Sequence, residues 1–221
     1  MDVGIVGGTG PAGRALGARL ASVGLKVVIG SRLPERAHEI VDGIHQKWPG
    51  RALPLTSAAN AEAASAPLVI IATPWDAAPD TAVSLREQLA GKVVVSMGNA
   101  LAKVEGELQA VVPPLGSVAA GVQAAVPEAL VAAAFQHLPA RSLGDLERPA
   151  SGDVLVCTDH PEALDATTEL IHRVPDLRAF AAGSLAAAGP VEAFTAVLLG
   201  LNARYKGRAT IHLTGLAERR A

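Results

Sequence analysis

Three glycines near the N-terminus, Gly8, Gly10 and Gly13, form the pattern G-x-G-x-x-G. In a dinucleotide-binding turn the first glycine permits the tight turn, the second lets the backbone approach a pyrophosphate, and the third lets helix and strand pack closely. Amide groups at the start of the helix then face the phosphates. The pattern alone is weak, but an apolar strand-like run precedes it and a helical pattern follows it. The sequence therefore predicts a dinucleotide site here.

The residues at the end of the second predicted strand indicate which dinucleotide binds. Ser31 and Arg32 stand about 20 residues beyond the glycines, where an NAD-specific site usually carries a carboxylate. A hydroxyl and a guanidinium bind a 2′-phosphate that a carboxylate would repel. Arg36 could add a second cation and Thr9 a hydroxyl. The alternative is that both arginines are simply solvated at a helix start, but cations there oppose the helix dipole. The pattern favours NADP(H) over NAD(H).

Further candidates stand where the fourth and fifth predicted strands end, at the carboxyl edge of the sheet, where open α/β folds bind ligands. Thr73, Pro74 and Trp75 are expected to shape the nicotinamide-ribose side, unless Trp75 only covers the core. Asn99 follows the next strand. Its amide would either hydrogen-bond a ribose or carboxamide or close a turn.

Acid–base machinery is sparse. Of the six histidines, His137 alone is predicted to lie in a loop that could enter the cleft. The chain lacks an H-E-x-x-H metal motif, a G-x-S-x-G nucleophile turn and a Lys-Tyr pair of the short-chain dehydrogenase type. We therefore expect no metal site and a reaction that needs no strong general acid.

The elements that position these residues follow from the hydrophobic pattern. Strands are predicted over 2–6, 26–30, 52–55, 68–73 and 92–97, with helices over 11–24, 34–48 and 80–90 between them. Ser57 is expected to cap a short helix after the third strand. Strands alternating with helices predict an α/β fold with a doubly wound parallel sheet. Beyond about residue 100 we expect helix over 116–127, strand or helix over 129–135, a polar loop over 136–152, strands over 153–157 and 177–180, and helices over 161–173 and 185–206.

Composition narrows the class of protein. Half of the 221 residues are hydrophobic and 3% are aromatic, which suits a sheet covered by helices. A net charge of -2 does not indicate electrostatic binding to nucleic acid or to an anionic membrane. A single cysteine, Cys157, excludes an internal disulfide and, with no signal peptide visible, fits a cytoplasmic protein. The apolar stretch 185–201 is interpreted as a buried helix rather than a membrane span.

Several segments together resemble the NADPH-dependent reductases of the deazaflavin coenzyme F420: GIVGGTGPAGRALGARLASVGLKVVIGSR, VIIATPWDAA, GKVVVSMGNAL, VAAAFQHLPAR and NARYKG. The resemblance covers residue 3 to about 214. It implies an N-terminal Rossmann domain over 1–135 and a smaller C-terminal α/β domain over 136–221, which completes a deazaflavin cleft and forms a homodimer.

The resemblance also implies roles for matching residues. Thr9, Gly10, Pro11 and Ala12 would line the pyrophosphate, and Ser31, Arg32 and Arg36 the 2′-phosphate. His137, Leu138 and Pro139 would lie beside the deazaflavin ring, with His137 orienting and polarising it. The implied reaction is hydride transfer between NADP(H) and coenzyme F420 in stacked rings, which needs orientation and exclusion of water more than a buried acid.

Two other functions stay open at this point. The first is an NADPH-dependent reductase of a small imine or carbonyl compound, for which His137, Tyr205 and Lys206 are the candidate proton donors. The second is a non-catalytic NADP(H)-binding module that keeps the glycine turn and Arg32 but shows no turnover.

Overall fold

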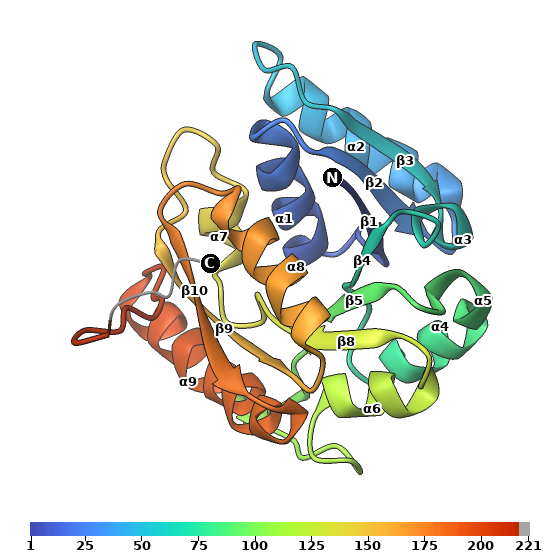
Figure 1. Cartoon of the computed structure of the whole chain (residues 1–221). Helices are drawn as coiled ribbons and strands as arrows, with labels where there is room; N and C mark the ends of the chain where they lie inside the picture. Colours follow the sequence, from blue (N-terminus) through green and yellow to red (C-terminus); the bar gives the residue numbers. More distant parts are fainter. Residues whose placement is uncertain (217–221) are drawn as a thin grey trace.

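The strands of the computed structural model, which describes residues 1–216, form one large sheet and one separate hairpin (Figure 1). Within those residues, eight strands make up the large sheet in the order β10-β9-β8-β5-β4-β1-β2-β3. All neighbouring pairs are parallel except β8 and β9, which are antiparallel. The strands are β1 Asp2–Val6, β2 Lys26–Ser31, β3 Leu55–Ala59, β4 Leu68–Ile71, β5 Val93–Ser96, β8 Leu130–Ala133, β9 Gly152–Thr158 and β10 Leu177–Gly183. The prediction of an α/β fold on a doubly wound sheet is confirmed.

Helices cover both faces of this sheet, because the central strands are apolar on both sides. Ile5, Ile70 and Val95 face a core shared with α1, α2 and α8, while Val6, Ile71 and Val94 face a second core with α4 and α6. The alternation follows the two-residue period of a strand. The helices are α1 Pro11–Ser22, α2 Pro34–Lys47, α3 Asn60–Ala63, α4 Ala78–Ser84, α5 Arg86–Leu89, α6 Val118–Ala125, α7 Ala140–Leu143, α8 Pro161–His172 and α9 Ala188–Tyr205.

Two local predictions were wrong. The third strand runs over Leu55–Ala59 rather than 52–55, so Ser57 lies within β3 and does not cap α3. A hairpin of β6 (Leu101–Val104) and β7 (Glu107–Ala110) was missed. Its turn residues Glu105 and Gly106 both have positive φ, at 50° and 91°, as a two-residue hairpin requires. Both strands are largely exposed, so they lack the apolar runs that marked the other strands.

The segment 136–152, predicted as a polar loop, is tied into the protein. It contains α7, and its first residues, 136–138, are buried. Arg19 of α1 donates to the backbone oxygens of Ser142, Leu143 and Arg148, each at 3.0 Å, and to that of Asp145. Because these carbonyl groups end α7 and the turn after it, the guanidinium of Arg19 fixes this segment on α1.

The expectation of a buried C-terminal helix holds for one side of α9 only. In α9 only one side is buried, and Phe194, Val197, Leu201 and Tyr205 lie exposed. Of the described residues, Leu185–Tyr205 alone is long and apolar enough to cross a membrane, with 28% of its most apolar window buried. A single helix of this kind is weak evidence for a membrane span.

The predicted boundary between residues 135 and 136 falls between β8 and β9, where strand pairing changes from parallel to antiparallel. In β9, Cys157 pairs with Ala133 at the carboxyl end of β8. The amino end of β9 therefore projects beyond the carboxyl edge of β8. The amino end of β9 thus lies beside the edge of the sheet that carries the candidate site.

Candidate functional site

The turn between β1 and α1 shows a distinct packing reason for each glycine of the motif. A β-carbon at Gly8 would lie 2.9 Å from the backbone oxygen of Ile5, and one at Gly13 would lie 2.8 Å from Cα of Gly8. A β-carbon at Gly10 would meet nothing within 4 Å. Gly8 and Gly13 are therefore required by packing, whereas the space at Gly10 is open to a ligand.

Neighbouring elements hold this turn in place. The amide of Gly7, a residue with φ of 68°, donates to Oδ1 of Asn60 at 3.0 Å. The amide of Gly8 donates to the backbone oxygen of Gly30 in β2 at 3.0 Å. Sequence reasoning missed Asn60, because its contact with Gly7 spans 53 positions of the chain.

The start of α1 presents unpaired donors. Within residues 1–216 no acceptor binds the amide groups of Thr9, Gly10, Ala12 and Gly13, and the N-cap residue Gly10 makes no side-chain cap. Pro11, at the first position of the helix, has no amide hydrogen. Amide groups converging at the positive end of a helix dipole fit a pyrophosphate.

A hydroxyl and two guanidinium groups follow Gly30, whose backbone oxygen is bonded to this turn: those of Ser31 at the end of β2, Arg32 after it and Arg36 in the first turn of α2. Ser31 is buried, and its Oγ accepts from the amide of Leu33 at 3.1 Å while keeping its own proton to donate. Arg32 and Arg36 are exposed, and no ion pair with either is found in the described part of the chain. The arrangement leaves the positive charges of both arginines available to a 2′-phosphate.

The end of β4 lies against the glycine turn. The side chain of Thr73 approaches Gly7 so closely that a β-carbon there would lie 2.4 Å from Cγ2 of Thr73. Oγ1 of Thr73 is buried without a hydrogen-bond partner among the described residues. Pro74 is exposed, and Trp75 packs partly buried against the core shared with α4 and α6.

The end of β5 meets the end of β8. Asn99 donates from Nδ2 to the backbone oxygen of Gln136 at 2.9 Å, and Thr195 of α9 donates to the same oxygen at 3.3 Å. Oδ1 of Asn99 has no partner within residues 1–216. Asn99 therefore joins two strand ends and still offers an acceptor.

His137 is buried, at 2% exposure, rather than open to a cleft. Its Nε2 lies 2.7 Å from the backbone oxygen of Asp153, which can only accept, so Nε2 must carry a proton. Burial lowers the pKa of His137, and the neutral ring keeps Nδ1 as an acceptor that has no partner in the described chain. In this tautomer His137 has no proton to donate to a ligand. Leu138 is buried beside it, and Pro139 is partly buried.

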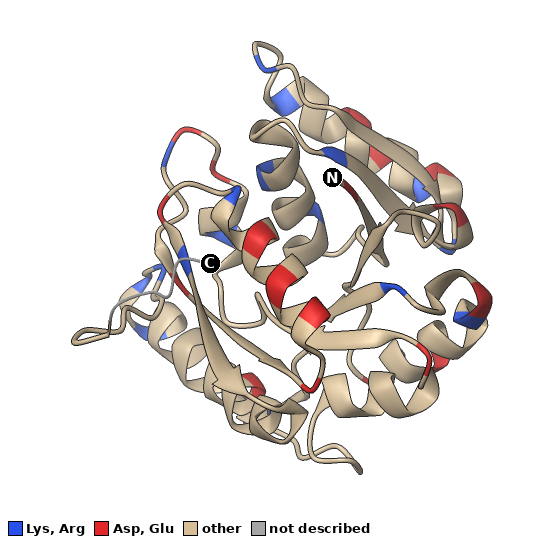
Figure 2. Ribbon diagram, viewed as in Figure 1, with Lys and Arg blue, Asp and Glu red and all other residues tan. Residues whose placement is uncertain are grey.

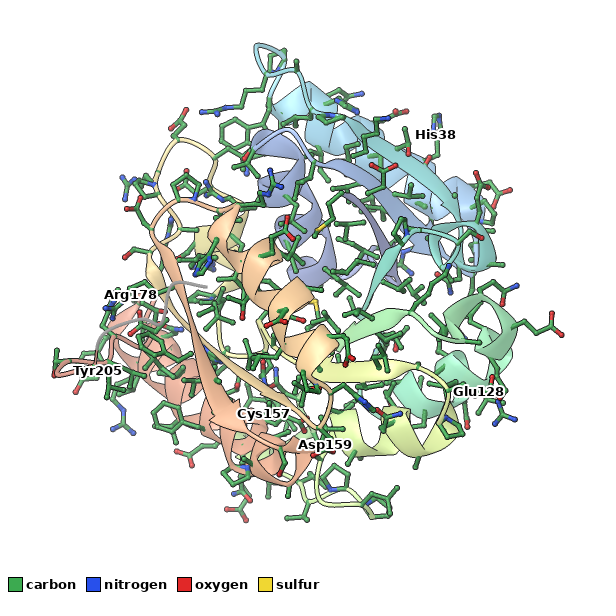
Figure 3. All side chains as sticks on the ribbon, in the orientation of Figure 1. His38, Glu128, Cys157, Asp159, Arg178 and Tyr205 are labelled. Atoms are coloured by element: carbon green, nitrogen blue, oxygen red, sulfur yellow. The ribbon has the colours of Figure 1, made fainter. Side chains whose placement is uncertain are left out.

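The other candidate proton donors, and the single cysteine, lie elsewhere. Tyr205 is 73% exposed at the outer end of α9 (Figure 3), and Lys206 follows it. Cys157 is buried in β9, where burial and the Glu192 carboxyl raise the pKa of its thiol to about 11. No cluster of three or more metal-ligating side chains is found in the described residues.

Sequence reasoning also missed Glu192 of α9. Its carboxyl is buried and accepts from the first amide groups of α6, those of Val118 at 2.8 Å and Ala119 at 3.2 Å. Burial raises the pKa of Glu192 to about 7, although these two hydrogen bonds lower it. One turn later, Thr195 bonds the end of β8. The buried side of α9 thus joins α6 to the candidate site.

Comparisons with known proteins agree with this geometry. A family model described as NADP oxidoreductase coenzyme F420-dependent matches residues 2–100. A curated relative from Methanocaldococcus jannaschii, named F420-dependent NADP reductase, is 36% identical over 222 residues, which cover 98% of this chain and 99% of the relative. One of the same name from Methanothermobacter marburgensis is 33% identical over 99% of this chain and 100% of its own length. A solved structure of a putative F420-dependent NADP reductase from an Arthrobacter species has the same fold, with a TM-score of 0.76, 24% identity and coverage of 96% of this chain and 99% of that one.

Proposed function

Because this chain belongs to the family of F420-dependent NADP reductases, we propose that it transfers a hydride between NADP(H) and coenzyme F420 at the carboxyl edge of its sheet. It is an NADP-dependent oxidoreductase. The observation that carries the proposal is the turn after β1, which has four unpaired amide groups and is bonded through Gly8 to Gly30, just before Ser31 and Arg32.

In this proposal NADP(H) lies across the carboxyl ends of β2, β1, β4 and β5. The amides of Thr9, Gly10, Ala12 and Gly13 bind the pyrophosphate, with Pro11 beside them. Ser31, Arg32 and Arg36 bind the 2′-phosphate. The end of β4, with Thr73, Pro74 and Trp75, and Asn99 after β5 contact the nicotinamide ribose and carboxamide. The unpaired oxygens of Thr73 and Asn99 support this placement.

The second coenzyme then lies next to β8, where residues 136–139 and α9 form the wall of the site. We divide the chain accordingly into a Rossmann domain over 1–135 and a smaller part over 136–221. The hydrogen bond from Asn99 to the backbone oxygen of Gln136 holds the two parts together at the site, and Thr195 of the smaller part donates to the same oxygen.

The coenzymes themselves supply the hydride donor and the hydride acceptor. The protein has to bind both rings in register, keep them in contact and exclude water. Its side chains fit that task, since the thiol of Cys157 stays protonated and the ring of His137 stays neutral. We propose that His137 positions the wall of the site through its bond to Asp153, rather than supplying a proton.

We further propose that the protein is a homodimer that buries the exposed side of α9. Val197 and Leu201 are 52% and 40% exposed on this side, and β7 of the hairpin packs on α9 with its own exposed Leu108. Apolar patches of this kind mark interfaces. Figure 2 shows acidic residues along α8 and basic residues at several separate places on the ribbon. We propose small-molecule coenzymes, and not nucleic acid, as the partners of this protein. We also propose that the protein is located in the cytoplasm.

One experiment tests the reaction. Purified protein is mixed anaerobically with NADPH and oxidised coenzyme F420, and the visible absorbance of the deazaflavin is followed. We expect bleaching that depends on the protein and slows strongly when NADH replaces NADPH. Turnover of a small imine or carbonyl compound without bleaching would identify a reductase of another substrate. Binding of NADPH with no turnover at all would identify a cofactor-binding module.

A further inference from the structure

Gln136, the residue just before His137, carries a buried amide that has no partner. The residue is 5% exposed, and neither Oε1 nor Nε2 has a hydrogen-bond partner within residues 1–216. A buried primary amide that leaves both its donor and its acceptor unpaired costs free energy. Native proteins keep such a group where it meets a ligand or a water.

The backbone of Gln136 is firmly held. Its carbonyl oxygen accepts from both Asn99, which follows β5, and Thr195, in the middle of α9. The preceding residue, Phe135, is buried and has a φ of 66°, in the left-handed region that bulky residues rarely adopt. Strained backbone of this kind persists where surrounding structure fixes it, and it is common at functional sites.

Other unpaired polar atoms gather at the same strand ends. Oγ of Ser96 closes β5, Oδ1 of Asn99 follows it, and Nδ1 of His137 comes directly after Gln136. Of these side chains, that of Gln136 alone has an unpaired donor and an unpaired acceptor in one plane. The free ring nitrogen of His137 can only accept, because the ring proton is bonded to Asp153. The group that matches such an amide presents an N–H beside a carbonyl.

We propose that the side chain of Gln136 binds the pyrimidinedione edge of the deazaflavin, with Oε1 accepting from the ring imide N–H and Nε2 donating to the adjacent ring carbonyl. This inference rests on the proposed function. The imide edge is favoured over the nicotinamide carboxamide because Gln136 follows β8, one strand farther from the glycine turn than Asn99 and two farther than Thr73. Neighbouring strands lie about 4.8 Å apart, so Gln136 belongs to the second ring. The three rotatable bonds of glutamine let the amide turn toward it.

The test uses Gln136→Met, which keeps the length of the side chain and removes both polar atoms. Dissociation constants for coenzyme F420 are measured from its fluorescence and those for NADPH by calorimetry. We expect deazaflavin binding to weaken about 10- to 100-fold, as for two lost hydrogen bonds, with NADPH binding unchanged. The melting temperature should stay the same or rise, because an unpaired buried amide has been removed. Gln46→Met, on the exposed side of α2, is the matched control and should change none of the three.

A second probe changes the ligand, and its main comparison uses only the wild-type protein. A deazaflavin methylated at the imide nitrogen cannot donate to Oε1, so the wild-type protein should bind it about 10- to 100-fold more weakly than the parent compound. Gln136→Met should bind both compounds equally. This comparison stands even where the substitution lowers the yield of folded protein.

Other results overturn the inference. If Gln136→Met binds the deazaflavin as the wild type does and melts at a lower temperature, the amide has a structural role. If NADPH binding weakens instead, the amide of Gln136 binds the nicotinamide carboxamide. If the wild-type protein binds the methylated compound as well as its parent, the imide edge is not recognised. Each of these requires that the wild type binds F420. If the wild type does not bind F420, the proposed function is overturned as well. That result is therefore distinguishable from a failure of the Gln136 inference alone.

Discussion

Two glycines of the same turn, Gly10 and Gly13, differ in what a side chain would meet. At Gly13 a β-carbon would lie 2.8 Å from Cα of Gly8 and 3.0 Å from Cβ of Ala72, whereas at Gly10 it would meet open space. The first position is constrained by packing within the protein. The second is constrained, on our proposal, by the ligand.

Gly10→Val should therefore fold normally and bind NADPH about 10- to 100-fold more weakly, since its branched side chain keeps the pyrophosphate from the amides of α1. Gly13→Val should instead lose about 1–3 kcal/mol of stability through overpacking. Calorimetric titration and chemical denaturation distinguish the two. Normal NADPH affinity in a folded Gly10→Val protein would return that glycine to a structural role.

Arg32 tests the cofactor preference. Arg32→Asp should weaken NADPH binding by about 1.5–3 kcal/mol, the scale of a charge-assisted hydrogen bond, and leave NADH binding little changed. Lys26→Asp makes the same charge change at the opposite end of β2 and should leave both affinities alone. Equal affinity of the wild-type protein for NADPH and NADH would contradict the 2′-phosphate site.

At the scale of elements, the buried carboxyl of Glu192 connects α9 to the first turn of α6. Its pKa rises from 4.5 to about 7 in the folded protein because burial disfavours the charged form. The folded state then binds more protons than the unfolded state between these values. Glu192 thus adds stability below pH 4.5 that is lost as the pH rises through about 7.

Glu192→Gln removes this titration. Between pH 5 and pH 8 the wild-type free energy of unfolding should fall by up to about 3 kcal/mol more than that of the variant. Urea denaturation at the two pH values measures the difference. Glu169→Gln, which alters an exposed ion pair with Arg173, should keep the wild-type pH dependence. A Glu192→Gln protein with that same dependence would show that the carboxyl titrates normally.

At the scale of the whole molecule, the exposed apolar side of α9, with Val197 and Leu201, is not covered by any other part of the described chain. Val197→Glu combined with Leu201→Glu should convert a dimer into a monomer, because it places charges at the centre of an apolar interface. Light scattering after size exclusion measures the mass, and circular dichroism should show unchanged helix content. Val83→Glu, at an exposed valine of α4, should remain dimeric. A monomeric wild-type protein would rule out the proposed interface.

Features that depend on neighbouring residues in the chain could be read from the sequence. The glycine turn, the strands around it and the pair Ser31 and Arg32 lie within one β-α-β unit, so local spacing fixes their relative positions. The family resemblance followed from the same motifs, and the comparisons confirm it.

Features that depend on distant contacts required the tertiary structure. Asp153 decides which ring nitrogen of His137 is left without a partner, and Asn99 and Thr195 fix the backbone of Gln136. All three reach residues 136 and 137 from other elements. The apolar pattern of α9 did not distinguish a core helix from an interface helix, because both need the same residues and differ only in what covers them. The sequence alone therefore determined the glycine turn and where the residues proposed to bind the phosphates stand in the chain. The wall of the proposed second site and the exposed side of α9 were decided only by packing between elements far apart in the chain.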